Sequence, residues 1–402
     1  MKAAPPRRSR SVNADIARAM QLHREGRFAQ AEALYRGVLQ AAPDHFDALH
    51  LLGVIEGQNN RFDAALELLR RAVAIRPDSA AAHNNLGNTL AGTQRYADAL
   101  ASFERALELK PDNPKALRNR GTVLRKLKRM NEAMASFDRA LEIDPGFTDA
   151  MVGRGELLQE LHRNAEAIES FRAALAGGKD LEALHYALAA LGAEPMPAAA
   201  PPGYVKALFD QYAQSFDSHL VETLNYRAPT LIAESVQRVA PRTGQDVVDL
   251  GCGTGLCGPL LRPLARTLTG VDLSDGMLAQ ARAGGHYDEL VCAELVAWLA
   301  QQNERFDLAV AADVMIYLGD LDASIAALRR ALRPGGVFVF SVESSPGTHF
   351  NLKPSRRYGH SPPYLRTLAD RHGLDVESIT NTVLREDAER DIDGHVVVLR
   401  RA

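Results

Sequence analysis

A glycine-rich turn between two aspartates carries the strongest chemical signal in this chain. The segment DLGCGTGLCG at residues 249–258 places Asp249 two residues before the first of four glycines. Glycines allow a tight turn and let the backbone approach a ligand, and a helix after them would point its amide groups at that ligand. An acid at Asp249 suits a ligand with an α-ammonium group and would repel a pyrophosphate. Asp272 ends the next apolar run, where a carboxylate can accept both ribose hydroxyls of a nucleoside.

The same glycines fit two nucleotide-binding patterns. Residues 253–258, GTGLCG, match the G-x-G-x-x-G pattern of dinucleotide-binding enzymes, which is a weak signal by itself. Residues 249–255, DLGCGTG, fit an acidic-x-Gly-x-Gly-x-Gly pattern. Asp272 does not separate the two patterns, because both kinds of ligand carry a ribose.

Strands that alternate with helices must position these residues. Apolar runs typical of strands recur at 246–250, 267–272, 290–292, 307–312, 337–342 and 395–399, and helical patterns lie between them. This alternation predicts an α/β domain with a doubly wound, mainly parallel sheet. Ligands of such sheets bind beyond the carboxyl ends of the strands, at the switch point of the strand order. We therefore expect the glycine turn and Asp272 to meet there.

Taken together, the motifs of residues 204–402 resemble the class I S-adenosylmethionine-dependent methyltransferases. The acidic glycine turn is followed by GVDLS at 270–274, CAE at 292–294, FDLAVAAD at 306–313 and LRPGG at 332–336, in the order and at the distances of that family. The resemblance implies a Rossmann-like fold, S-adenosylmethionine as the cofactor, and methyl transfer to an unidentified small-molecule or protein acceptor. The alternatives are a NAD-type dinucleotide-binding enzyme and a non-catalytic scaffold or adenosylmethionine-binding module.

The resemblance also implies roles for individual residues. Asp249 would lie near the methionine ammonium, and Asp272 would bind the ribose hydroxyls. The backbone amides of Gly251, Gly253 and Gly255 would line the methionine and the ribose. Leu273 and Met277 would pack near the adenine, Glu294 would contact its amino group, and Tyr212 would be a lid residue. A purely structural role is the alternative for several of them: Asp272 as a helix N-cap neighbour, Met277 in the core, and Glu294 as an acid in the first turn of a helix. The resemblance also implies that residues 209–229, which precede the sheet, cover the cofactor pocket, and Phe216, His219 and Tyr226 are further candidates in that segment.

Methyl transfer asks little of the protein beyond alignment, because the sulfonium is already activated. A general base is needed only if the acceptor carries a proton at pH 7. Candidates for that base are His219, His360, Tyr317 and Asp313, and Arg357 can hold an acidic substrate. The fourth strand is followed by DVMIY at 313–317 and not by Asn-Pro-Pro-Tyr, which argues against an amino-directed nucleic-acid methyltransferase.

The first half of the chain is a repeat array with a period of 34 residues. Prolines, glycines and large apolar residues each recur at this step: Pro43, Pro77, Pro111 and Pro145; Gly53, Gly87, Gly121 and Gly155; Tyr35, Leu69, Phe103, Phe137 and Phe171. Arg27, Arg61, Arg95, Arg129 and Arg163 keep the same register, where a turn between two helices is expected. Five such units, at about 11–178, resemble tetratricopeptide repeats.

Each repeat unit predicts two helices that approach at the small residue, with the large residue filling the space between units and proline ending the second helix. An all-α solenoid of this kind offers a groove for a peptide or partner protein, and the alternative is a spacer or oligomerisation scaffold. Candidate groove residues are Asn84, Asn85, Asn88, Arg118, Arg120 and Arg154.

The predicted organisation is a basic tail at 1–10, five repeats with a capping helix at 11–192, a Pro/Ala linker at 193–203 and the methyltransferase domain at 204–402. A net charge of −3 gives no general case for nucleic acid or an anionic membrane as partner. No run of eighteen apolar residues appears, which argues against a spanning helix. The three cysteines lack zinc-site spacing, so we expect no metal and a reducing, cytoplasmic location.

Overall fold

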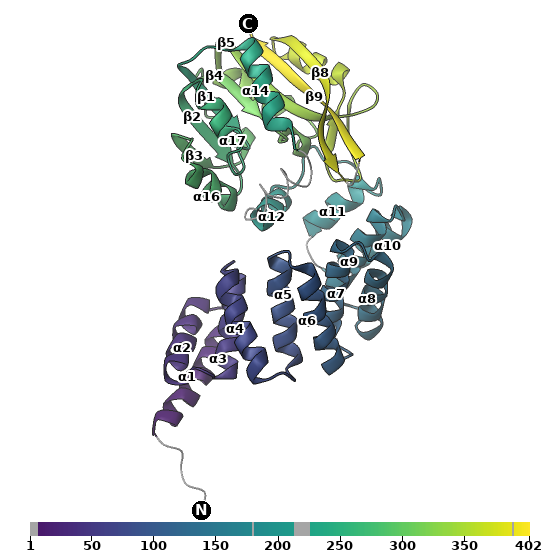
Figure 1. Ribbon diagram of the computed structural model, residues 1–402. Helices are drawn as coiled ribbons and strands as arrows, with labels where there is room; N and C mark the ends of the chain where they lie inside the picture. The colour runs from purple at the N-terminus through teal and green to yellow at the C-terminus, as the bar shows by residue number, and fades with distance from the viewer. Residues whose placement is uncertain (1–6, 179–180, 213–225, 388–389) are drawn as a thin grey trace, which may run out of the picture. The chain divides into compact units, whose positions relative to one another are not determined.

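The chain divides into two compact units, Met1–Lys179 and Asp180–Ala402, which are described separately (Figure 1). The computed structural model describes residues 7–178, 181–212, 226–387 and 390–402. Within these ranges, no helix is both long enough and apolar enough to cross a bilayer.

The described part of the first unit consists of ten helices in five consecutive pairs. Their bounds are α1 Arg7–Arg24, α2 Phe28–Ala41, α3 Phe46–Gln58, α4 Phe62–Ile75, α5 Ala80–Gly92, α6 Tyr96–Leu109, α7 Pro114–Lys126, α8 Met130–Ile143, α9 Thr148–Glu160 and α10 Asn164–Ala176. The periodic arginines stand immediately before the second helix of each pair, and the helices α2, α4, α6 and α8 end before the periodic prolines. The solenoid predicted from the period is confirmed.

Small residues of the array face the large ones, as the period predicts. A Cβ atom on Gly87 would lie 2.7 Å from the ring of Phe103, and one on Gly155 would lie 2.6 Å from the ring of Phe171. Both rings are almost completely buried. Glycine is therefore needed where the first helix of a pair meets the large side chain of the second.

The second unit is built on a sheet with nine strands in the described residues. They are β1 Gln245–Leu250, β2 Ala265–Asp272, β3 Glu289–Cys292, β4 Phe306–Ala311, β5 Leu332–Ser344, β6 Phe350–Leu352, β7 Tyr358–His360, β8 Leu374–Asp387 and β9 Arg390–Arg401. The order is β3-β2-β1-β4-β5-β7-β6, and β9 pairs antiparallel with both β5 and β8. β1 to β5 are parallel, and the strand order switches between β1 and β4.

Helices cover both faces of this sheet, which makes it doubly wound. One face packs against α17 Leu295–Leu299, α18 Asp322–Ala331 and α19 Pro362–Arg371. The other face packs against α14 Ala228–Val239 and the short α15 Gly258–Leu261. The remaining described elements are α11 Leu181–Ala190, α12 Pro202–Tyr212, α16 Asp275–Gly284 and the 3-10 turn η2 Met315–Tyr317.

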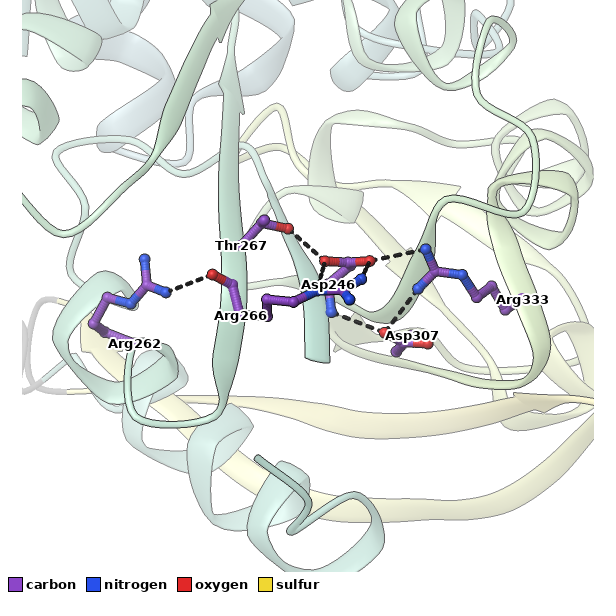
Figure 2. A network of polar contacts seen from close by, with 6 residues as sticks. All are labelled: Asp246, Arg262, Arg266, Thr267, Asp307 and Arg333. Atoms are coloured by element: carbon purple, nitrogen blue, oxygen red, sulfur yellow. Dashed lines mark hydrogen bonds and ion pairs between the residues drawn. The ribbon is translucent and has the colours of Figure 1, made fainter. Parts of the chain in front are cut away.

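A polar network joins the first residues of four parallel strands (Figure 2). Asp246 of β1 accepts hydrogen bonds from Thr267 of β2 at 2.8 Å and from Arg333 of β5 at 2.8 Å, and it pairs with Arg266. Arg333 also donates to Asp307 of β4 at 2.8 Å. Because these residues begin the strands, the network fixes the strand register at the edge opposite the glycine turn and Asp272.

Two predicted boundaries differ from the structure. The helix α11, expected to cap the repeats, belongs to the second unit, where Tyr186 packs against Tyr204 and Tyr358. The Pro/Ala segment 193–203, expected to be a linker, is bonded along the second unit as well. The carbonyl of Ala198 accepts from the amide of Gly319 at 2.8 Å, and the amide of Ala200 donates to the carbonyl of Tyr317 at 2.8 Å.

Candidate functional site

A cavity of about 220 Å³ opens at the carboxyl ends of β1, β2 and β4 in the second unit. This is the switch point of the strand order, where the sequence pattern places the ligand. One part of its wall comes from β1 to β3 and includes Asp249, Asp272 and Glu294. Another part comes from later segments and includes Asp313, Tyr317, Arg357 and Arg385.

The glycine turn has left-handed backbone at three positions, with φ of +64° at Gly251, +55° at Gly253 and +95° at Gly255. Glycine adopts this conformation without the steric cost of a Cβ atom. A Cβ on Gly251 would also lie 2.4 Å from Val314, and one on Gly255 would lie 3.1 Å from the ring of Tyr287. Gly251 and Gly253 line the cavity. The turn therefore packs closely against Val314 and Tyr287 and exposes its backbone to the cavity.

Asp272 holds the glycine turn against the end of β2. Its Oδ2 accepts a hydrogen bond from the amide of Gly253 at 2.9 Å, and its Oδ1 accepts one from the amide of Ser274 at 2.8 Å. Burial raises the pKa of Asp272 above its ordinary value, although these amide bonds favour the ionised form. Asp272 therefore has a structural role next to the N-cap Ser274, and it also lines the cavity.

Asp249 is 1% exposed and lines the cavity at the end of β1. Its Oδ2 accepts a hydrogen bond from the hydroxyl of Tyr287 at 2.7 Å. Burial, reinforced by the charge of Asp272, raises the pKa of Asp249 to about 7, and the tyrosine bond opposes that rise. A cation in the cavity would stabilise the ionised form of this carboxylate.

The residues expected around adenine separate in the structure. Leu273 lines the cavity. Met277 is completely buried in α16 among core side chains, outside the cavity wall, so its structural alternative holds. Glu294 lines the cavity but is the N-cap of α17, where its carboxylate accepts from the amides of Val296 at 3.0 Å and Ala297 at 2.7 Å. Sequence reasoning did not foresee that both oxygens of Glu294 are used in capping.

The segment expected to cover the pocket is only partly described. Phe216 and His219 lie outside the described residues, as does the side chain of Tyr212. Tyr226 lines the cavity, and burial raises the pKa of its hydroxyl well above the ordinary value. Phe209 of α12 also lines it and meets the ring of Tyr317 edge-on, with centroids 5.5 Å apart.

Asp313 is the end of a buried ion-pair network. Its φ of +56° is unusual for an aspartate, and its Oδ2 accepts from Arg385 at 2.7 Å while its Oδ1 accepts from Ser341 at 3.2 Å. Arg385 is 1% exposed and pairs with Glu343 as well. Although burial opposes it, Arg385 and Lys353 hold the pKa of Glu343 below its ordinary value. Both oxygens of Asp313 are thus engaged, which disfavours a role as general base.

Of the other base candidates, His219 lies outside the described residues, and His360 and Tyr317 occupy unfavourable positions. His360 is completely buried outside the cavity wall, with Nε2 3.0 Å from the carbonyl of Gly319, and burial lowers its pKa to about 4. The prediction of His360 as a base therefore finds no support in the geometry. Tyr317 lines the cavity, but burial raises the pKa of its hydroxyl, so it stays protonated at pH 7. In the described part of the chain, no three His, Cys, Asp or Glu side chains gather as a metal site requires.

The predicted groove residues of the first unit are bonded to neighbouring helices. The amide of Asn119 donates to Asn84 at 3.1 Å and to Asn88 at 2.8 Å, and Asn85 contacts His50 at 2.8 Å. The three arginines make similar contacts: Arg118 with Asp149, Arg120 with Ser136, and Arg154 with Asp138 and Ser170. The bonds of the asparagines, and those of Arg118 and Arg154 to aspartates, link successive repeats. The bonds to Ser136 and Ser170 join the two helices of one repeat, so these residues brace the array.

Comparison with known proteins agrees with this architecture. Residues 248–340 match the family model of a methyltransferase domain, and residues 22–88 and 84–146 match two tetratricopeptide repeat models. The chain is 33% identical over 141 residues to a malonyl-[acyl-carrier protein] O-methyltransferase of Pseudescherichia vulneris, covering 35% of this chain and 54% of that protein. It is 29% identical over 191 residues to a ubiquinone biosynthesis O-methyltransferase of Thiobacillus denitrificans, covering 40% and 82%.

A third relative is a probable S-adenosylmethionine-dependent methyltransferase of Mycolicibacterium smegmatis, 32% identical over 146 residues, covering 35% of this chain and 56% of that protein. The chain spans about half the length of the first and third of these relatives. The protein therefore carries tetratricopeptide repeats followed by a segment that matches a methyltransferase domain.

Proposed function

We propose that the cavity binds S-adenosylmethionine and that the protein transfers its methyl group to an acceptor bound beside Tyr317 and Arg357. One observation carries this proposal: two acids, Asp249 and Asp272, flank an open glycine turn at the switch point of the sheet. Asp249 is buried, and among the described residues no cationic side chain bonds to it; the methionine ammonium would supply that charge. A pyrophosphate beside Asp249 would be repelled, so the NAD-type alternative fits this cavity less well.

The remaining cofactor contacts follow from the cavity wall. Asp272 would accept the ribose hydroxyls with the lone pairs that its two amide bonds leave. Leu273 would lie against the adenine, and the amides of Gly251 and Gly253 would face the methionine and ribose. When bound, S-adenosylmethionine supplies the activated methyl group. The protein's own task is to hold donor and acceptor in line and to exclude water.

None of the base candidates among the described residues is well placed to accept a proton, which supports an acceptor atom that needs no general base. Asp313 is held by Arg385 and Ser341, and the Tyr317 hydroxyl stays protonated. Arg357 lines the cavity 3.9 Å from Glu343, and a guanidinium has five N–H donors with which it can hold a further carboxylate. These features support an acidic acceptor, such as a carboxylate already ionised at neutral pH.

The repeats support a second, separable role in recruiting a partner protein. Tetratricopeptide repeats provide a surface for protein interaction, and the bonded asparagines of α5 and α7 make that surface rigid. If the repeats recruit the acceptor, changing Asn84 and Asn88 to alanine lowers methylation of it without changing cofactor affinity. If they only scaffold an assembly, methylation is unchanged.

The test is a labelled-methyl transfer screen of the purified full chain against host lysate, divided into protein and small-molecule fractions. We expect label in an acidic acceptor, and none when Asp249 is changed to Asn. The matched control is Asp322→Asn, which alters an acid on α18 outside the cavity wall. Absence of label together with absence of S-adenosylhomocysteine binding would contradict the proposal, whereas binding without transfer would indicate a non-catalytic module.

A further inference from the structure

Tyr287 lies directly beneath the glycine turn, although no sequence motif marks it. Its hydroxyl donates to Oδ2 of Asp249 at 2.7 Å. Its ring fills the space that a Cβ atom would need at each of three glycines. A Cβ atom would lie 3.1 Å from the ring at Gly255, 3.0 Å at Gly258 and 2.9 Å at Gly270. The three glycines therefore form a seat for one aromatic ring.

The backbone around Tyr287 is fixed on both sides. Before it, α16 ends at Gly285 in the left-handed conformation, with φ of +68°. After it, Oδ2 of Asp288 accepts from the amide of Leu268 at 2.7 Å and from Arg262 at 2.7 Å. The amide of Asp288 in turn donates to the carbonyl of Leu268 at 2.9 Å. A tyrosine anchored in this way presents its hydroxyl at one defined place.

The Tyr287 hydroxyl bonds to one oxygen of the Asp249 carboxylate, and the other oxygen remains available to a ligand. Oδ2 is bonded to Tyr287, while no residue of the described parts of the chain bonds to Oδ1. Asp249 lines the cavity, so Oδ1 is the atom available to a bound cation. Tyr287 itself is not part of the cavity wall, and it would act only through Asp249.

We propose that Tyr287 is a positioning residue that fixes the Asp249 carboxylate for the ammonium group of the methyl donor. This inference rests on the proposed function. A phenolic hydroxyl bonded to a carboxylate stabilises its charged form, so removing the hydroxyl makes the carboxylate harder to ionise. Two consequences follow for a variant without the hydroxyl: weaker binding of the ammonium group, and a pH midpoint of binding that moves upward.

Within the described residues, five other titratable groups act on Asp249 from the elements around it. They are Asp272 of β2, Cys252 and Cys257 of the turn, Tyr287 before β3 and Tyr226 before α14. Burial raises the pKa values of the two thiols and the two phenols, so these four groups stay protonated at neutral pH. Asp272 can add to the pH dependence, which is why the test includes a variant of Asp249.

The experiment is calorimetric titration of the full chain with S-adenosylhomocysteine between pH 5.5 and 8. In the wild type, affinity should fall as the pH drops through about 7, because protonated Asp249 no longer attracts the ammonium. In Tyr287→Phe, which keeps the ring in its seat, the midpoint should rise by about one unit or more, so that affinity at pH 7 falls about fivefold or more. Tyr364→Phe is the matched control, since it removes a hydroxyl bonded to Asp320 away from the cavity.

The double variant separates positioning from a merely structural effect. Asp249→Asn should remove the midpoint near 7, and adding Tyr287→Phe to it should then change affinity less than twofold. An unshifted midpoint in Tyr287→Phe would overturn the inference, and so would an equal loss of affinity in the Asp249→Asn background. A wild type that binds no S-adenosylhomocysteine at any pH would instead overturn the proposed function, and the inference with it.

Discussion

Replacing Asp249 by asparagine should stabilise the unliganded protein while weakening its hold on the cofactor. Asparagine has nearly the size of aspartate and can still accept the hydrogen bond from Tyr287. It carries no charge, so it escapes the cost of ionisation in a buried place. The same change removes the group proposed to attract the methionine ammonium.

The size of the stabilisation follows from the pKa of Asp249. The fold raises it from an ordinary 3.8 to about 7, a shift of roughly three units. Each unit corresponds to about 1.4 kcal/mol, so the ionised carboxylate costs the folded state about 4 kcal/mol. Because the folded pKa lies above the unfolded one, this cost is absent below about pH 4, grows up to about pH 7 and is constant above it. The variant's advantage should follow the same course.

The chain contains one tryptophan, which makes the measurement specific. Trp298 is 8% exposed in the core of the second unit, so its fluorescence during urea unfolding reports on that unit alone. We expect the free energy of unfolding of Asp249→Asn to exceed that of the wild type by several kcal/mol at pH 8 and by clearly less at pH 5. A variant less stable than the wild type at pH 8, or a gap independent of pH, would refute the reasoning.

Two further predictions use the same preparations. Asp272→Ala should weaken S-adenosylhomocysteine binding about 100-fold or more in calorimetry, because hydrogen bonds to a charged acceptor are lost. Ser274→Ala removes a helix cap and a hydrogen bond to Asp210 but no group of the cavity wall, so it should leave affinity within a few-fold. Equal affinities of Asp272→Ala and wild type would exclude the ribose contact. Arg385→Met should lower the free energy of unfolding, followed by tryptophan fluorescence, by about 3 kcal/mol or more, because it leaves the buried Glu343 with one cation fewer. Arg371→Met breaks an exposed ion pair and should lower it by about 1 kcal/mol or less. Equal costs for the two arginines would contradict the burial argument.

The sequence predicts the elements whose signals are local. The 34-residue period predicts the helix pairs, and apolar runs predict β1 to β5 and β9, although β5 and β9 each begin five residues before their predicted runs. The long strand β8 is missed, because it alternates polar and apolar residues and pairs only with β9. The turn residues Gly251, Gly253 and Asp272 meet at the cavity because their pattern encodes a strand end followed by a tight loop.

Contacts between distant parts of the chain are what the sequence leaves open. Arg385 finds Asp313 and Glu343, which lie 72 and 42 residues away in the chain, and no spacing rule connects them. Tyr287 reaches Asp249 across 38 residues. Glu294 has a weaker local signal: an acid at the start of a helix is favoured by the helix dipole, but glutamate is not among the preferred N-cap residues.

The segment 193–203 has a consequence for any attempt to study the two halves apart. Ala200 and Pro202 form part of the cavity wall, and the Tyr186 hydroxyl donates to the carbonyl of Arg356, the neighbour of Arg357. The composition suggests a domain boundary at residue 204, but a fragment that begins there would lack part of the wall of its own cavity. Loss of activity in such a fragment would reflect the damaged cavity and not the absence of the repeats. The two units should therefore be separated between Lys179 and Asp180.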